Sequence, residues 1–173
     1  AFVPVDATIT VGGLLGTETV PLHQMLYRVG AGCVSAPLYA FGDGGASFTA
    51  SGIPAQQQRA TDFHEISITA QDPAAGSTRT IVEYFHTLAD RTVTLGAAMP
   101  LPAISTLAGP YKRLQAVYTL PADFNFQTQF TYASATQSIT MLATLAYLGG
   151  QATTLAFPDY SALAGWDNGW APG

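Results

Sequence analysis

Apolar and polar residues alternate one by one along several segments of the chain, which is the pattern of a β-strand with one buried face. The clearest case is FNFQTQFTY, residues 124–132, where aromatic residues occupy one face and polar residues the other. The same alternation occurs in residues 5–12, 63–70, 91–97 and 112–120. These segments are rich in β-branched and aromatic residues, which favour strands. The pattern therefore predicts a chain built mainly from strands.

Clusters of Gly, Pro and Asp separate the alternating segments and are typical of turns. They fall at residues 12–13, 42–45, 72–76, 120–123 and 149–150. Strands that follow one another at about ten-residue spacing with such turns favour an antiparallel sandwich or barrel. We therefore expect an all-β fold, an antiparallel β-sandwich with few or no helices.

Residues 137–148 fit two kinds of element. A helix would gather apolar residues on one face and end before Gly149. A strand would pair with residues 124–132 across a turn at 133–136. The Thr and Ser residues within the segment, and the strong strand that precedes it, favour the strand.

The segment 97–110 contains three prolines. Proline lacks the backbone N–H and is confined to sheet edges and loops, so we expect a connection here. It would join two β halves, about 1–96 and 111–150, that share one core within a single domain of 1–173. Residues 151–173 would follow as an aromatic C-terminal tail.

The composition is unusually poor in charge. Charged residues make up 10% of the chain, against roughly 25% in an average soluble protein. The surface must therefore consist largely of Thr, Ser, Gln, Ala and Gly. Such a surface suits a protein whose outside is covered by neighbours, and it equally suits a secreted protein in which Ala, Thr and Gly are common.

The net charge is −5, and Lys112 and Arg113 are the only adjacent cations. Nucleic-acid binding requires clustered Lys and Arg to neutralise phosphates, so that class is excluded. No segment approaches the roughly 20 apolar residues that span a bilayer as a helix. The chain begins at Ala1 without Met or a positively charged leader. This fits an exported protein, periplasmic or extracellular, whose signal peptide was removed, and also a chain that lacks its first residues.

The three histidines give little indication of catalysis. His64 shares the alternation of Ile66 and Ile68, so we expect a hydrogen-bonded structural histidine at the rim of the core. Glu83 and His86 have a metal-binding spacing only on a helix, whereas their segment has the pattern of a strand. A small hydrolase with a site assembled around His64 or His86 is the least favoured of the functional hypotheses. We expect no catalytic residues and no cofactor.

The remaining candidates for reactivity and for metal binding are also weak. Cys33 is the only cysteine, lies among apolar residues, and is expected to be a small buried side chain. Asp43 alone, or Asp159 with Asp167 and Asn168, would supply too few of the six to eight oxygens that calcium takes. We therefore expect no metal site.

Residues 45–70, GASFTASGIPAQQQRATDFHEISITA, combine a Gly, an alternating strand, a small-residue–Pro turn and a second alternating strand. The residues that fill this pattern are Gly45, Phe48, Gly52, Ile53, Pro54, Ile66 and Ile68. The segment resembles the second half of a transthyretin-like, carboxypeptidase-regulatory-type β-sandwich. The resemblance implies an immunoglobulin- or transthyretin-like sandwich of the kind found in bacterial extracytoplasmic proteins and lipoproteins. Such modules generally bind or support and rarely catalyse.

The C-terminal tail holds both tryptophans, Trp166 and Trp170, together with Tyr160. Three interpretations remain open: the tail covers its own core, it docks on a protein partner, or its rings stack on sugars. For docking, we expect these three residues to make the main contact. Pro102 and Leu107 of the proline-rich segment would make a second one.

Together these patterns predict a non-enzymatic accessory or structural subunit that docks peripherally on a larger, membrane-associated protein assembly. A photosynthetic reaction centre with its antenna, or another energy-converting complex, is one such assembly that the sequence permits. The alternative is a carbohydrate-binding or cell-surface adhesion module that uses the C-terminal tryptophans.

Overall fold

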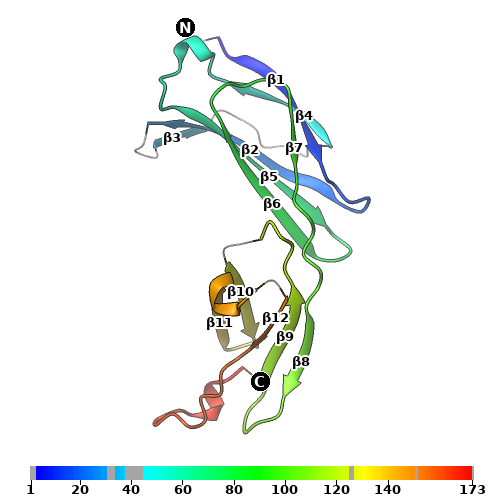
Figure 1. Ribbon diagram of the computed structural model, residues 1–173, viewed down its shortest axis with the longest axis vertical. Helices are drawn as coiled ribbons and strands as arrows, with labels where there is room; N and C mark the ends of the chain where they lie inside the picture. The colour runs from blue at the N-terminus through cyan, green and yellow to red at the C-terminus, as the bar shows by residue number, and fades with distance from the viewer. Residues whose placement is uncertain (1–2, 31–33, 38–44, 125–126, 151, 173) are drawn as a thin grey trace. The chain divides into compact units, whose positions relative to one another are not determined.

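The computed structural model of the protein describes residues 3–30, 34–37, 45–124, 127–150 and 152–172. Strands dominate these residues, and the helical segments described among them, α1, η1 and η2, are three or four residues long. The predicted all-β fold is therefore confirmed. The chain divides into two compact units, Ala1–Gly96 (unit 1) and Ala97–Gly173 (unit 2) (Figure 1).

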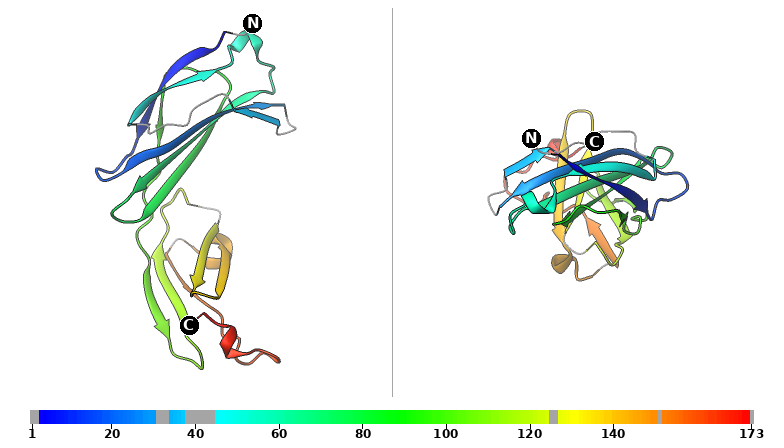
Figure 2. Two further views of the ribbon diagram at one scale, coloured as in Figure 1. Left: turned by 180° about the vertical axis from the view of Figure 1, so that it is seen from behind. Right: turned by 90° about the horizontal axis from the view of Figure 1, so that it is seen from above.

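Unit 1 is a sandwich of two sheets (Figures 1 and 2). The first has the order β4-β1-β7, and the second has the order β3-β2-β5-β6. The strands are β1 (Val5–Gly12), β2 (Thr19–Val29), β3 (Val34–Pro37), β4 (Ser47–Gly52), β5 (Phe63–Asp72), β6 (Ser77–Phe85) and β7 (Arg91–Thr94). β1 and β7 run parallel, and the other described pairs are antiparallel.

The core of unit 1 lies between its two sheets. In β1, Ile9 is fully buried, and in β5 Ile66 and Ile68 are fully buried. Apart from the buried Glu65, their neighbours along the strands are exposed or half-buried, which is the period of two that the sequence shows in 5–12 and 63–70. Burial of each such side chain contributes about 1.5–3 kcal/mol, which makes this cluster the main source of the unit's stability.

The outer face of the sheet β4-β1-β7 is polar and carries little charge. It exposes a set of hydroxyl side chains that lie opposite one another across the strands: Thr8, Thr10, Ser47, Thr49, Thr92 and Thr94. On this face, threonine and serine side chains occupy surface positions that charged residues hold in many other proteins, which agrees with the low content of charged residues.

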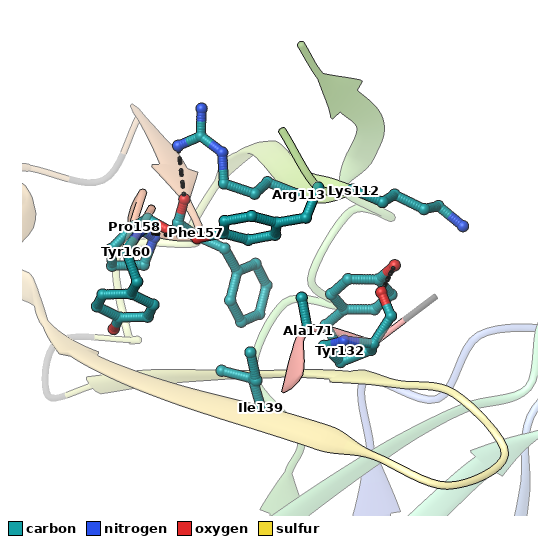
Figure 3. A pocket seen from close by; sticks show the side chains of 10 residues that line it. Lys112, Arg113, Tyr132, Ile139, Phe157, Pro158, Tyr160 and Ala171 are labelled. Carbon is teal, nitrogen blue, oxygen red and sulfur yellow. Dashed lines mark hydrogen bonds between the residues drawn. The ribbon is translucent and has the colours of Figure 1, made fainter. Parts of the chain in front are cut away.

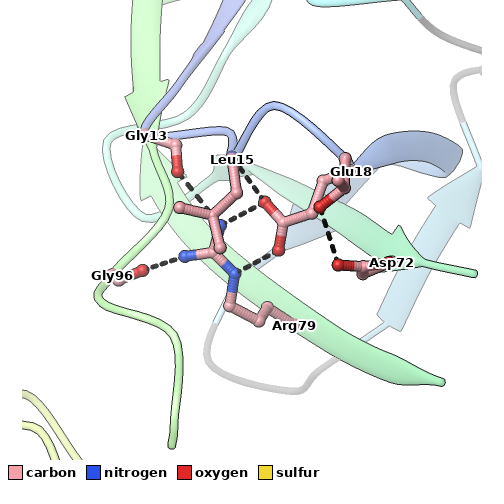
Figure 4. A network of polar contacts seen from close by, with 7 residues as sticks. Gly13, Leu15, Glu18, Asp72, Arg79 and Gly96 are labelled. Atoms are coloured by element: carbon pink, nitrogen blue, oxygen red, sulfur yellow. Dashed lines mark hydrogen bonds and ion pairs between the residues drawn. The ribbon is translucent and has the colours of Figure 1, made fainter. Parts of the chain in front are cut away.

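One end of unit 1 is closed by a buried ion pair (Figure 4). Arg79 of β6 donates from Nε to Oε1 of Glu18 over 2.8 Å and from a second nitrogen to the other carboxylate oxygen. The guanidinium also donates to the carbonyl oxygens of Gly13 and Gly96. Glu18 accepts a further hydrogen bond from the backbone N–H of Leu15 at 2.8 Å. The pair thereby joins the β1–β2 loop, β6 and the last residue of unit 1.

Unit 2 contains a three-stranded sheet with the order β12-β9-β8 and a separate hairpin, β10-β11. Its elements are β8 (Ala103–Leu107), β9 (Arg113–Thr119), β10 (Gln127–Ala133), β11 (Ser138–Thr144), α1 (Leu145–Leu148) and β12 (Ala152–Ala156). Its buried cluster is smaller than that of unit 1 and includes Ala116, Tyr118 and Leu155.

The ambiguous segment 137–148 forms mainly a strand, as the sequence favoured. β11 pairs with β10, and the last pair before the turn is Ala133 with Ser138. The strand ends at Thr144, whose hydroxyl accepts a hydrogen bond from the backbone N–H of Tyr147 and caps the single turn α1. Gly149 ends this turn with a φ of 76°, a conformation that glycine adopts without strain.

One expectation about the organisation of the chain needs correction. The segment 97–110 is more than a connection, because β8 forms within it and pairs with β9. Its prolines fall outside that strand, so they do not interrupt the ladder. The buried apolar residues that the structure describes form one cluster in each unit. That the two halves share one core within a single domain of 1–173 stays a prediction.

Candidate functional site

The predicted tail 151–173 is a tail only in part, because strand β12 forms within it. The aromatic tail proper, residues 157–172, is fastened to unit 2 at its base (Figure 3). The hydroxyl of Tyr111 accepts a hydrogen bond from the backbone N–H of Tyr160 at 2.7 Å and donates to the carbonyl of Pro158 at 3.2 Å. Arg113 donates to the carbonyl of Phe157 at 3.4 Å and lies 3.4 Å from a carboxylate oxygen of Asp159. The first residues of the tail therefore have fixed backbone positions.

Four aromatic rings gather along the tail, and we call them the aromatic tail cluster: Tyr111, Tyr160, Trp166 and Trp170. The ring of Trp166 is central, with centroids 5.5 Å from Tyr111, 5.1 Å from Tyr160 and 5.7 Å from Trp170. The two indoles meet nearly at right angles, at 85°, which is an edge-to-face arrangement that aromatic pairs favour. The structure thus brings together all three tail residues that the sequence singled out.

Hydrogen bonds set the position of the Trp166 indole and of the backbone beside Trp170. The Trp166 Nε1–H donates to Oδ1 of Asn168 at 3.1 Å, and Oδ1 of Asp167 accepts from the backbone N–H of Gly169 at 2.8 Å. The second bond caps the short helix η2 (Asn168–Trp170). Gln137 of the hairpin turn donates to the carbonyl of Gly169 at 2.6 Å and ties this helix to the hairpin.

The end of the tail is buried in unit 2. Pro172 is fully buried, and its carbonyl accepts a hydrogen bond from the Tyr132 hydroxyl at 2.6 Å. The space enclosed beneath the tail is only about 10 Å³, room for roughly one water molecule (Figure 3). Trp170, in contrast, is 57% exposed. The tail therefore packs on its own unit and also presents one tryptophan to the outside.

The tail carboxylates are engaged in structural hydrogen bonds. Oδ1 of Asp159 accepts from the backbone N–H of Ser161, and hydrogen bonds from Ser161 together with the Arg113 charge lower the pKa of the Asp159 carboxyl. Asp167 and Asn168 use one oxygen each for the contacts described above. Within the described residues, no three His, Cys, Asp or Glu side chains lie together as metal ligands. Cys33 and Asp43 lie outside those residues.

The predicted second contact is brought near the tail only in part. Leu107 pairs with Arg113 across β8 and β9, and Arg113 holds the base of the tail. Pro102 precedes the opposite end of β8, which places it about 16 Å further along the strand at roughly 3.3 Å per residue. Tyr111 was missed, because its role depends on carbonyl and amide groups 47 and 49 residues away, which no local pattern indicates.

His64 lies in unit 1 and has a structural environment. It is fully buried rather than at the rim, its Nε2 accepts from the backbone N–H of Ile53 at 3.1 Å, and its Nδ1 donates to the carbonyl of His86 at 3.0 Å. Burial lowers the pKa of the imidazole, so the ring is held neutral. With both nitrogens engaged, His64 has none available to act as a base.

The two other histidines are also held by unit 1. His86 donates from Nδ1 to the carbonyl of Asp62 at 2.7 Å. His23 is buried and stacks on Phe48 with ring centroids 3.7 Å apart. Burial lowers the pKa of His23 as well.

Comparison of the chain with protein-family models, curated proteins and solved structures finds no match. Among the described residues, no helix is both long enough and apolar enough to cross a membrane.

Proposed function

We propose that the protein is a non-enzymatic, exported accessory or structural subunit that docks on a larger protein assembly through the aromatic tail cluster. The observation that carries this proposal is the state of Trp170. Its indole is 57% exposed although the residues on both sides of it are fixed: Gln137 binds Gly169, and Ala171 and Pro172 are buried. A large aromatic side chain held in place at the surface is the usual anchor of a protein interface.

The preorganisation of the tail supports docking for an energetic reason. Ordering a free side chain on binding costs about 0.5–1.5 kcal/mol, and ordering a loose tail costs more. The hydrogen bonds of Tyr111, Asn168 and Gln137 order the tail already during folding, so the entropy of ordering it is not lost again on binding. Leu163, which is 58% exposed in the same tail, adds apolar area beside the cluster.

The class of protein is proposed from unit 1. Residues 45–70 fold as strand β4, a turn with the short helix η1 (Ala55–Gln57), and strand β5, which is the arrangement that the transthyretin-like resemblance implies. The two-sheet sandwich supports a relationship to such extracytoplasmic modules. A location outside the cytoplasm and a membrane-associated host, such as a photosynthetic or other energy-converting complex, belong to the same proposal.

The test is gentle detergent extraction from the native source, followed by native mass determination of the complex that carries the chain. We expect a mass far above 18.1 kDa with other polypeptides present. Trp170→Ala should lower the amount of complex at least tenfold, because truncating such an anchor typically removes 2 kcal/mol or more of binding free energy, or about 30-fold in affinity.

Tyr147→Ala is the matched control, since Tyr147 is 81% exposed on α1 of the same unit and lies outside the cluster. Its complex should form as in the wild type. A wild-type chain that runs near 18.1 kDa without partners would contradict the proposal. Quenching of tryptophan fluorescence by soluble glycans, lost in Trp170→Ala, would support the carbohydrate-binding alternative instead.

A further inference from the structure

Unit 2 contains a second cavity, which is distinct from the aromatic tail cluster. Its volume is about 170 Å³, and it lies between the inner face of the sheet β12-β9-β8 and the hairpin β10-β11. The sheet contributes aliphatic side chains from all three of its strands, and aromatic side chains close the other sides. The apolar lining includes Ile104, Leu114, Leu155, Phe130, Tyr132 and Phe157.

The cavity exists because a small residue occupies the centre of its floor. Ala116 pairs with Ile104 on one side and with Leu155 on the other, so the three form one row across the sheet. The two neighbours are large and Ala116 is small, which leaves a depression between them. Phe130 and Tyr132 cover it from the hairpin, since both belong to the inward-facing positions of β10.

The cavity reaches the surface beside β8. Ile104 lines it and is 53% exposed, whereas Leu155 at the opposite edge of the row is buried. β8 is an edge strand of the sheet. A ligand would therefore enter past Ile104 without any rearrangement of the hairpin.

The lining accepts an uncharged ligand. Among the described lining residues, none is charged, and the polar ones are Gln115, Thr131 and Tyr132. The Tyr132 hydroxyl is already bound to the Pro172 carbonyl. An engineered, enclosed cavity of about 150 Å³ lined by Leu, Ile and Phe binds benzene, so apolar walls of this size suffice to hold one aromatic ring. We propose that this cavity is a binding site for a small, uncharged aromatic molecule of the size of toluene.

The experiment is a titration of the ¹⁵N-labelled full chain with toluene, followed by amide chemical shifts. We expect saturable shifts at residues 104, 116, 130 and 155, and none at Ile68 in the core of unit 1, which serves as an internal control. Benzoate should not bind, because burying its carboxylate without a partner is unfavourable. Absence of saturable shifts, or shifts confined to Trp166 and Trp170, would overturn the proposal.

Two variants locate the site. Ala116→Leu fills the floor of the cavity, and Ile104→Trp covers its mouth from a half-exposed position that tolerates a larger side chain. Each should weaken toluene binding at least tenfold, and the second remains informative if the first does not fold. Val117→Leu is the control, because Val117 is 44% exposed on the opposite face of β9, and it should bind as the wild type does. Unchanged binding in both cavity variants would also overturn the proposal.

Discussion

The hydroxyl of Tyr132 donates a hydrogen bond to the backbone carbonyl of Pro172, 2.6 Å away and 40 residues later in the chain. Tyr132 belongs to the hairpin strand β10, and Pro172 is the last described residue of the tail. A single buried contact thus connects the hairpin of unit 2 to the end of the chain.

Tyr132→Phe should loosen the tail, because the Pro172 carbonyl stays buried and loses this donor. The expected loss in the free energy of unfolding is about 1–3 kcal/mol, the usual penalty for an unsatisfied buried group. Urea unfolding and limited proteolysis of the last residues measure it. Tyr147→Phe, at an 81% exposed position, should leave both measurements unchanged. Equal proteolysis of the two variants would show that this bond does not hold the tail.

Gly52 should not tolerate a side chain. A Cβ placed there would lie 2.7 Å from Nε2 of His64 and 2.7 Å from Cδ2 of Leu88. Gly52→Ala should therefore displace His64 and reduce stability by about 1–3 kcal/mol, as overpacking of a core does. Gly16→Ala is the control, since no described atom lies within 4 Å of its Cβ position and its φ is not positive. Thermal unfolding of the two variants compares them directly, and equal midpoints would contradict the expectation.

Removing Arg79 should cost more than removing the whole ion pair. The Glu18 side chain is only 2% exposed, so Arg79→Met leaves a buried carboxylate without its counter-charge, at about 3–5 kcal/mol. Arg79→Met combined with Glu18→Met should recover part of this loss, because no charge is then left unpaired. Urea unfolding of the two single variants and the double variant completes the cycle. A double variant less stable than Arg79→Met would contradict this account.

Stability should fall as the pH decreases from about 6.5. Burial lowers the pKa of His64 and His23 below their ordinary value of 6.5. Between the folded and unfolded pKa values the unfolded chain binds more protons, so the free energy of unfolding rises with pH there. This contribution is fully present above pH 6.5 and is lost as the pH falls through the folded-state values. Urea unfolding at pH 7.5 and 5.5 checks the sign, and equal or greater stability at pH 5.5 would contradict it.

The carboxylates act in a more acidic range. Hydrogen bonds from Arg79 lower the pKa of Glu18 below 4.5, and those from Thr17 lower the pKa of Asp72 below 3.8. Both carboxylates therefore stabilise the fold at a pH above their ordinary pKa values, and this stabilisation is lost as the pH falls through their lowered pKa values in the folded state. The histidine effect is thus separable from the carboxylate effect by pH alone.

The strands that could be predicted are those in which one face is buried and the other is more exposed. β1, β5, β9 and β10 have such faces, and their alternation is visible in the sequence. β2 was not predicted, because the apolar Leu22 lies on its exposed face and the polar His23 on its buried face. A register shift between Thr19 and Leu22 also breaks the period of two. β12 is only five residues long and offers too few positions for a pattern.

The sequence indicated which residues belong to the candidate site, but it did not indicate how they are arranged. Trp166 and Trp170 stand out in the sequence because they are the only tryptophans of the chain. Their fixed positions depend on Gln137 and Tyr111, which come from a hairpin turn and from the segment before β9. These contacts join parts of the chain that are far apart, so no local periodicity contains them. The buried position of His64 was missed for a related reason, since it requires the space that Gly52 leaves on β4, a strand of the other sheet.

The parallel pairing of β1 and β7 has a mechanical consequence. They are the first and last described strands of unit 1, and Ile9 to Gly12 lie beside Arg91 to Thr94 in register. Because the two strands are parallel, the start of β1 and the end of β7 lie at opposite ends of the pair. A tension applied between Val5 and Thr94 would act along the strands and load their hydrogen bonds in shear, all at once. Unit 1 should therefore resist stretching far better than a hairpin that unzips one bond at a time.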